Sequence, residues 1–241
     1  MYVAIDFGIS NTDLAISDQG KIVFHTTPSQ SSVINADTLK NILKKHEIDI
    51  SNVKKIGVTG GKSSDLDDAL DGVKIAKINE IDAIGLGAKK LYGIGEESAL
   101  VVSAGTGTAC VHVQGNNFNH LGGIAVGGGM LEGLGALLFK NSNGLEINEF
   151  ANSGSRAELD LLIGDVVNKI GNLSPEITAV NFGQAKSSSA DTMENTAAAL
   201  CNMIGEVIGT VAYLNALLVG SDKACFIGRT SYLSEIVDGI N

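Results

Sequence analysis

Two short turns of small residues in this sequence have the composition of phosphate-binding loops. One follows the apolar run YVAIDF and the other follows the apolar run ALVVSA. Glycine lets backbone N–H groups face an anion, and serine or threonine hydroxyls add donors. The residues concerned are Gly8, Ser10 and Asn11 in the first turn and Gly105, Thr106, Gly107 and Thr108 in the second. Each turn alone is more simply a tight β-turn, so only the pair predicts a polyphosphate site.

Three carboxylates stand beside apolar runs. Asp6 ends the first run next to the first turn, and Mg²⁺ prefers oxygen ligands of this kind. Glu80 and Asp82 follow the run VKIAKI at the start of a predicted helix. A carboxylate there can accept a proton from a hydroxyl, as phosphoryl transfer to an alcohol requires. Capping of the helix N-terminus explains the same two residues, so both interpretations stay open.

A third glycine cluster, GGIAVGGGMLEGLG, spans residues 122–135 and enters a helix predicted to begin near Gly128. Its bare backbone at Gly127, Gly128 and Gly129 could lie against a planar group such as a nucleotide base or ribose. Close helix packing also needs glycine and is the alternative.

The elements around these residues alternate in type. An antiparallel meander of three strands opens the chain, and a second strand-turn-strand unit surrounds residues 105–108. IDFGISNTDLAI and VSAGTGTACVHV are similar, which indicates two halves of similar shape. Other segments are predicted as helices (35–47, 145–152, 156–170, 191–219 and part of 231–240) or strands (54–61 and 223–228). The pattern predicts an α/β protein with an N-terminal lobe over 1–90 and a C-terminal lobe over 91–241.

Composition excludes several classes of protein. The net charge of −10 with 17 basic residues gives no basic surface for nucleic acid. Cys110, Cys201 and Cys225 lack the spacing of a disulfide framework or metal site and are expected to be buried thiols. The apolar stretch 197–219 carries Glu206 at its centre, which favours a buried or dimer-forming helix over a membrane span. With no leader sequence at the N-terminus, the expected location is the cytoplasm, without a membrane.

The motifs together resemble a known superfamily. Asp6-Phe7-Gly8 with Ser10, the SAGTGTA turn and the GGGMLEGL helix are similar to the phosphate-1, phosphate-2 and adenosine segments of the acetate and sugar kinase, Hsp70 and actin superfamily. More narrowly, the sequence resembles the type II pantothenate kinases. The matching motifs, in order, are VTGG, NEIDAIGLG, GTGTA, LGGIAVGGGMLEGLGALL, ITAVNFG, GEVIGTVA and FIG.

This resemblance implies two ribonuclease-H-like lobes of the actin-like ATPase fold, with a cleft for Mg²⁺ and ATP between them. It also implies a homodimer and an ATP-dependent kinase that phosphorylates the 4′-hydroxyl of pantothenate, the first step of coenzyme A biosynthesis. Glu80 would be the general base and Asp6 the magnesium-organising residue. Residues 105–108 would hold phosphates, and residues 127–129 with Leu131 would line the adenosine side. His120 and Gly122 would lie on the side of the acceptor substrate.

Three departures from the family pattern keep other functions open. Asn11-Thr12-Asp13 stand where many relatives have a basic residue, and Asn119-His120 replace an arginine, so that His120 would be a weaker substitute. The sequence also stops at Asn241, before the family's last strand and helix. The alternatives are a kinase of another small alcohol and a degenerate nucleotide-binding relative without pantothenate kinase activity. The activators that share these lobes need clustered cysteines, which this sequence lacks.

Overall fold

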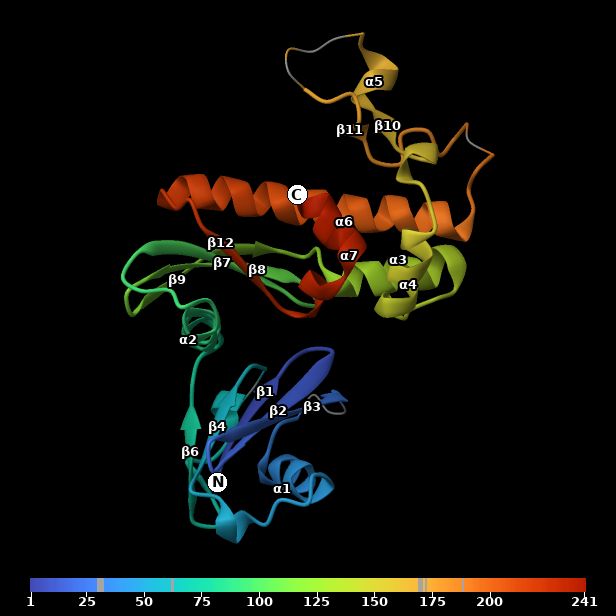
Figure 1. Cartoon of the computed structure of the whole chain (residues 1–241). Helices are drawn as coiled ribbons and strands as arrows, with labels where there is room; N and C mark the ends of the chain where they lie inside the picture. Colours follow the sequence, from blue (N-terminus) through green and yellow to red (C-terminus); the bar gives the residue numbers. More distant parts are fainter. Residues whose placement is uncertain (30–32, 62, 169–170, 172, 188) are drawn as a thin grey trace. The chain divides into compact units, whose positions relative to one another are not determined.

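Two structural units make up the chain in the computed structural model, Met1–Gly87 and Ala88–Asn241 (Figure 1). They are called unit 1 and unit 2 below. The structure describes residues 1–29, 33–61, 63–168, 171, 173–187 and 189–241. Each unit combines a mixed β-sheet with helices, and each is described separately.

The sheet of unit 1 has the strand order β3-β2-β1-β4-β6-β5. The three strands of the predicted meander are confirmed: β1 pairs antiparallel with β2, and β2 pairs antiparallel with β3. β4 lies parallel to β1, and β6 lies parallel to β4. The strands are β1 (Tyr2–Phe7), β2 (Asn11–Asp18), β3 (Lys21–Pro28), β4 (Lys55–Thr59), β5 (Ala69–Leu70) and β6 (Val73–Lys77).

Alternation along β1 decides which face of this sheet is buried. Val3, Ile5 and Phe7 point into the core, whereas Asp6 lies on the other face and is exposed. Helix α1 (Ala36–Lys45) covers the buried face with Leu39 and Leu43, which belong to the same apolar cluster. Its start is fixed by a capping box in which Asn35 and Thr38 bond each other's backbone. The short helices of this unit are η1 (Ile50–Asn52) and η2 (Ser63–Asp65), and α2 (Glu80–Tyr92) follows β6.

The sheet of unit 2 repeats the topology of unit 1. Its order is β12-β7-β8-β9, with an antiparallel meander and a fourth strand parallel to the first. Unit 1 has the same arrangement in β4-β1-β2-β3. The likeness that the two hairpin sequences indicate therefore extends to four strands. The strands are β7 (Ser98–Ala104), β8 (Thr108–Gln114), β9 (Asn117–Ile124) and β12 (Ala224–Ile227), of which β9 was not predicted.

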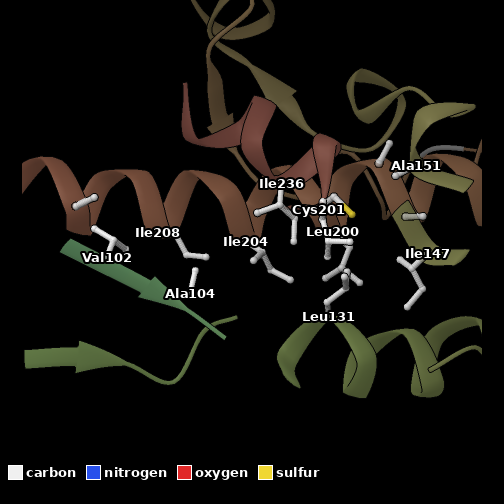
Figure 2. Packing of buried hydrophobic residues seen from close by; sticks show 14 of the residues in the cluster. Val102, Ala104, Leu131, Ile147, Ala151, Leu200, Cys201, Ile204, Ile208 and Ile236 are labelled. Carbon is white, nitrogen blue, oxygen red and sulfur yellow. The ribbon is translucent and has the colours of Figure 1, made fainter. Parts of the chain in front are cut away.

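Helix α6 (Met193–Val219) is the central helix of unit 2 and lies along one face of the sheet (Figure 1). Figure 2 shows its Ile204 and Ile208 pointing toward the side of β7 and α3, where Ala104 and Leu131 are. Its length and composition would also suit a membrane span, but 56% of the most apolar window is buried inside the protein. The prediction of a buried helix is thus confirmed. The other helices here are α3 (Gly128–Phe139), α4 (Gly144–Asn152) and α7 (Ser234–Ile240).

The helix predicted over 156–170 is wrong. The described part of this segment forms η3 (Arg156–Glu158), β10 (Leu161–Leu162) and α5 (Ile163–Val166), and β10 pairs with β11 (Thr178–Val180). Residues 169 and 170 lie outside the described residues. The cause is a tertiary contact: the fully buried carboxylate of Asp160 accepts hydrogen bonds from the Phe182 backbone N–H at 2.8 Å and from Asn202 Nδ2 at 3.3 Å.

Burial governs the ionisable groups of this core. It raises the pKa of the Asp160 carboxyl, while the Phe182 N–H and the Arg156 guanidinium act in the opposite direction. The Asp160 carboxylate thereby joins the β10–β11 segment to α6 through Asn202. All three cysteines are buried and free, and burial raises the pKa of Cys201 to about 12. The expectation of buried thiols is confirmed.

Glycine lets α6 and α7 approach closely. A Cβ built on Gly205 would lie 2.8 Å from Gly239 Cα, and a Cβ on Gly239 would lie 2.8 Å from the Asn202 carbonyl oxygen. The two helix backbones are therefore in direct contact, with no room for side chains between them.

We expect Gly205→Ala to lower the free energy of unfolding by about 1–3 kcal/mol, because the added methyl group has to push two backbones apart. Urea unfolding followed by circular dichroism measures this. Gly133→Ala is the matched control, since no heavy atom lies within 4 Å of its added Cβ, and it should be neutral or stabilise α3 by up to about 1 kcal/mol. Equal effects of the two substitutions would contradict the packing argument.

Candidate functional site

The two predicted turns occupy equivalent places in the two units. The first turn follows β1, whose parallel neighbour β4 ends at the same edge, and the second turn follows β7 beside β12. In open α/β sheets this carboxyl edge is where ligands bind. Gly60 after β4 and Gly228 after β12 both have positive φ, 73° and 94°.

Both of these glycines are required by close backbone approach. A Cβ on Gly60 would overlap the Asp6 carboxylate and lie 2.8 Å from the Phe7 carbonyl oxygen, and a Cβ on Gly228 would overlap the Ala104 carbonyl. Neither glycine was predicted as a site residue. Their signal was present in the VTGG and FIG motifs, where an apolar strand ends in glycine.

The first turn is exposed and is held by Ser29, the residue after β3. Ser29 donates through Oγ to the Gly8 carbonyl at 2.8 Å and through its backbone N–H to the Ser10 carbonyl at 2.9 Å. Gly8 is needed here, because a Cβ would lie 2.7 Å from the Asn11 carbonyl oxygen. Gly8 and Ser10 are exposed and Asn11 is half-buried. Ser29 was not predicted, since its partners lie about 20 residues earlier in the chain.

Asp6 lies on the open face of unit 1 next to this turn. In the sheet register it pairs with Asp13 of β2 and Thr59 of β4, so the three side chains lie on one face. Carboxylate and hydroxyl oxygens suit Mg²⁺, which commonly takes only one or two carboxylates and completes its shell with water and phosphate. Within the described part of the chain, no group of three or more acidic, histidine or cysteine side chains forms a metal cage. The donor chemistry around Asp6 therefore fits a magnesium ion that is shared with a phosphate ligand.

At the start of α2, Asp82 and Glu80 have different surroundings. The Asp82 backbone N–H donates to Asn79 Oδ1 at 2.9 Å, and Asn79 Nδ2 donates back to the Asp82 carboxylate. Asn79 therefore caps the helix, and the Asp82 carboxylate holds the Asn79 side chain in place. Glu80 is exposed and takes no part in this pair, which leaves it as the candidate base.

In unit 2, the second turn and the N-terminus of α3 are hydrogen-bonded to each other. The Gly128 backbone N–H donates to the Gly105 carbonyl at 2.8 Å, and the Gly129 N–H donates to the Thr106 carbonyl at 3.0 Å. A bond from Gly105 N–H to the Gly107 carbonyl, 2.8 Å long, closes the turn. Two of the glycine clusters predicted from the sequence thus form one structure.

This contact gives the third glycine cluster a packing role. A Cβ on Gly127 would lie 2.7 Å from the Gly105 carbonyl oxygen, and one on Gly129 would lie 2.6 Å from Thr106 Cγ2. The bare backbone of residues 127–129 therefore packs against the second turn, with Gly127 buried and Gly128 and Gly129 half-buried, and the predicted contact of these residues with a nucleotide stays a prediction. Close packing, the alternative interpretation, explains these glycines.

Two other predicted nucleotide contacts are corrected. The Leu131 side chain is 0% exposed and lies in the core of unit 2, so it cannot face adenosine in this structure. The Thr108 hydroxyl donates its single proton to the Val126 carbonyl at 2.8 Å and is buried. It holds the segment before α3 in place, which leaves Thr106 and Gly107, both half-buried, as the candidate phosphate contacts of the turn.

His120 and Gly122 flank a β-bulge in β9. Val111 pairs with His120 and Cys110 pairs with Gly122, so Leu121 is the extra residue. Gly122 has φ 129°, a conformation that other residues rarely adopt. His120 is exposed beside this irregularity. Bulges of this kind re-aim side chains and are common next to functional sites.

Comparison with known proteins places the chain in a family. The family model described as Fumble matches residues 89–236. The type II pantothenate kinase of Oceanobacillus iheyensis is 30% identical over 233 residues, which cover 95% of this chain and 84% of that protein. The chain belongs to the type II pantothenate kinase family.

Solved structures that are similar to this pantothenate kinase homologue show its fold. The activator of 2-hydroxyisocaproyl-CoA dehydratase from Clostridium difficile, solved with ADPNP, matches 99% of this chain and 83% of its own with a TM-score of 0.64 and 16% identity. A ROK family protein from Streptococcus pneumoniae in complex with sucrose matches 99% of this chain and 84% of its own with a TM-score of 0.58 and 12% identity. The predicted fold class, α/β with two ribonuclease-H-like lobes of the actin-like ATPase fold, is confirmed.

Gly127 and Gly105 differ in how closely neighbouring atoms approach them, and alanine substitutions can measure this difference. We expect Gly127→Ala to destabilise the kinase homologue by about 1–3 kcal/mol and to weaken nucleotide binding, because its methyl group displaces the second turn. Gly105→Ala is the matched control, since the nearest atom to its Cβ is 3.9 Å away, and it should change stability by less than about 1 kcal/mol. Thermal unfolding with and without ATP measures both. The same loss of stability in both variants would argue against this contact.

Proposed function

We propose that this chain transfers the γ-phosphoryl group of ATP to the 4′-hydroxyl of pantothenate, the first step of coenzyme A biosynthesis. The observation that carries the proposal is the likeness to a type II pantothenate kinase over 95% of the chain. The second turn and the acid at the start of α2 lie within this likeness. The chain is accordingly a phosphotransferase with an alcohol group as acceptor.

Each unit supplies proposed phosphate contacts from its own turn. Gly8, Ser10 and Asn11 supply donors in unit 1, and Thr106 and Gly107 supply them in unit 2, on the backbone that Gly105 and Gly128 hold in place. Asp6 is the proposed ligand of Mg²⁺, directly or through water. A bound magnesium ion would neutralise charge that develops on the phosphate oxygens.

Glu80 is the proposed general base. Its exposed carboxylate accepts the proton of the acceptor hydroxyl while that oxygen forms a bond to the γ-phosphorus and the bond from phosphorus to the leaving ADP oxygen breaks. His120 and Gly122, beside the bulge of β9, are the proposed contacts on the acceptor side. His120 would supply hydrogen bonds there, in the position where the family pattern has an arginine.

Loss of the base should abolish turnover without unfolding the protein. For Glu80→Gln we expect kcat to fall by about 10²- to 10⁴-fold, because an amide cannot take the hydroxyl proton. Release of ADP from ATP, with and without pantothenate, measures this. Asp82→Asn is the matched control on the same helical turn and should keep most of the activity, since its carboxylate bonds Asn79.

The other outcomes of this assay identify the alternatives. Turnover with a different small alcohol, but not with pantothenate, would mean a kinase with another acceptor. Nucleotide binding without any turnover would mean a degenerate relative. Retained activity in Glu80→Gln would exclude Glu80 as the base.

A homodimer formed through α6 is also part of the proposal. Four large side chains of its C-terminal half share one exposed face: Tyr213 (64% exposed), Leu214 (56%), Leu217 (59%) and Leu218 (74%). Their spacing of one, four and five residues places them side by side on the helix. Contiguous apolar surface of this kind usually marks an interface. The proposed location is the cytoplasm, in keeping with the burial of the opposite face of α6 in the core.

We expect the double substitution Leu214→Glu and Leu218→Glu to convert the dimer to a monomer, because charge on this face cannot be buried against a second copy. Light scattering after size-exclusion chromatography gives the mass. Ile22→Glu, on the edge strand β3 and similarly exposed at 58%, is the control and should leave the mass unchanged. A wild-type protein that is monomeric at micromolar concentration would contradict this part of the proposal.

A further inference from the structure

Thr230 connects the last strand of unit 2 to the second turn. It lies in η4 (Arg229–Tyr232), which follows β12, and its side chain is buried, with 2% of the residue exposed. Its hydroxyl donates to the Gly105 carbonyl at 2.7 Å and accepts from the Gly128 backbone N–H at 3.0 Å. Its two partners are 125 and 102 residues away in sequence.

These bonds form a closed triangle. The Gly128 N–H also donates to the Gly105 carbonyl, at 2.8 Å, so this carbonyl accepts two hydrogen bonds and the N–H is shared between two acceptors. A hydroxyl is required at the third corner, because that group has to donate and accept at once. The approach is close on every side, since a Cβ on Gly128 would lie only 3.0 Å from Thr230 Oγ1.

The Gly105 end of the second turn is held by hydrogen bonds, which are those of this triangle and the bond from its own N–H to the Gly107 carbonyl. Two of the turn's four residues are glycines, which leave the backbone freedom that a side chain would remove. The nearest atom to a Cβ built on Gly105 is 3.9 Å away, and it belongs to the turn itself. Gly105 is therefore held in place by the hydrogen bonds to its carbonyl and not by side-chain packing.

We propose that Thr230 is a positioning residue of the nucleotide site: its hydroxyl keeps the second turn and the N-terminus of α3 in the arrangement that receives the phosphates of ATP. The inference rests on the proposed function in that it takes the second turn as a phosphate contact. Thr230 itself is buried behind the turn and does not touch the nucleotide. Ordering the turn before binding removes an entropic cost that the nucleotide would otherwise bear.

Thr230→Val tests the proposal, because valine keeps the shape of threonine and loses the hydroxyl. We expect the Kd for ADP and ATP, measured by isothermal titration calorimetry, to rise about tenfold or more. In steady-state kinetics with pantothenate, KM for ATP should rise by a similar factor, with a smaller change in kcat. Thr230→Ser keeps the hydroxyl and should restore wild-type affinity.

Ser221→Ala is the matched control for a general loss of stability. The Ser221 hydroxyl lies within hydrogen-bond distance of the Ser98 carbonyl at 3.0 Å and the Lys223 carbonyl at 2.9 Å and can donate its proton to either of them, at the opposite end of β7 from the second turn. This variant should lower the unfolding midpoint and leave the nucleotide Kd unchanged. An unchanged Kd in Thr230→Val together with a lowered midpoint would show a structural role only and would overturn the proposal.

A variant that does not fold and a failure of the proposed function can both be distinguished from a failure of this proposal. If Thr230→Val does not fold, Thr230→Cys, whose thiol is a weak donor, is compared with Thr230→Ser; equal nucleotide affinities would overturn the proposal, and weaker binding by the cysteine variant would support it. If the wild-type protein binds nucleotide without pantothenate turnover, the proposed function fails while the affinity test of Thr230 stands. If the wild-type protein binds no nucleotide, both fail.

Discussion

The contact between bare backbones at residues 105–107 and 127–129 is the constraint on which the site of unit 2 depends. The first N–H groups of a helix have no partner within the helix. In α3 two of them bond the carbonyls of Gly105 and Thr106. Because this contact is made without side chains between the segments, it brings a helix N-terminus within hydrogen-bond distance of a strand turn. Substitution of Gly127 or Gly129 would push the two segments apart, because a Cβ at either position would meet the second turn.

The repeated topology explains why this contact lies where it does. In both units the first strand of the meander has a parallel neighbour, so two carboxyl ends meet beside the first hairpin turn. A glycine with positive φ follows the neighbour in each case, Gly60 and Gly228. The units differ in what holds the turn: Ser29, the residue after β3, in unit 1, and α3 with Thr230 in unit 2. The two units thus share a sheet topology but hold the turn with different residues.

Helix α6 serves unit 2 in two ways. Its buried face, with Leu200, Ile204 and Ile208, forms the core under β7 and α3. Through Asn202 it also bonds the buried carboxylate of Asp160, which keeps the chain after η3 out of a helix. The desolvation that raises the pKa of Asp160 is offset by hydrogen bonds that only the folded chain provides. The apolar face of the C-terminal half of α6 is the part of this helix that the core leaves exposed.

The sequence by itself determined most strands and most helices, because alternation, capping residues and glycines are local signals. It did not predict β9, β10 or β11. It also determined the family, since the motifs occur in order along nearly the whole chain. Only the tertiary structure decided which residues of the site contact each other. Leu131 is buried and the Thr108 hydroxyl donates to the Val126 carbonyl, although the motif predicted that both would contact the nucleotide. Segment 156–170 does not form the predicted helix, because the Asp160 carboxylate accepts a hydrogen bond from Phe182. Thr230 bonds partners that are more than 100 residues away in sequence. Hydrogen bonds between distant segments leave no periodicity in the sequence, so the sequence alone could not reveal them.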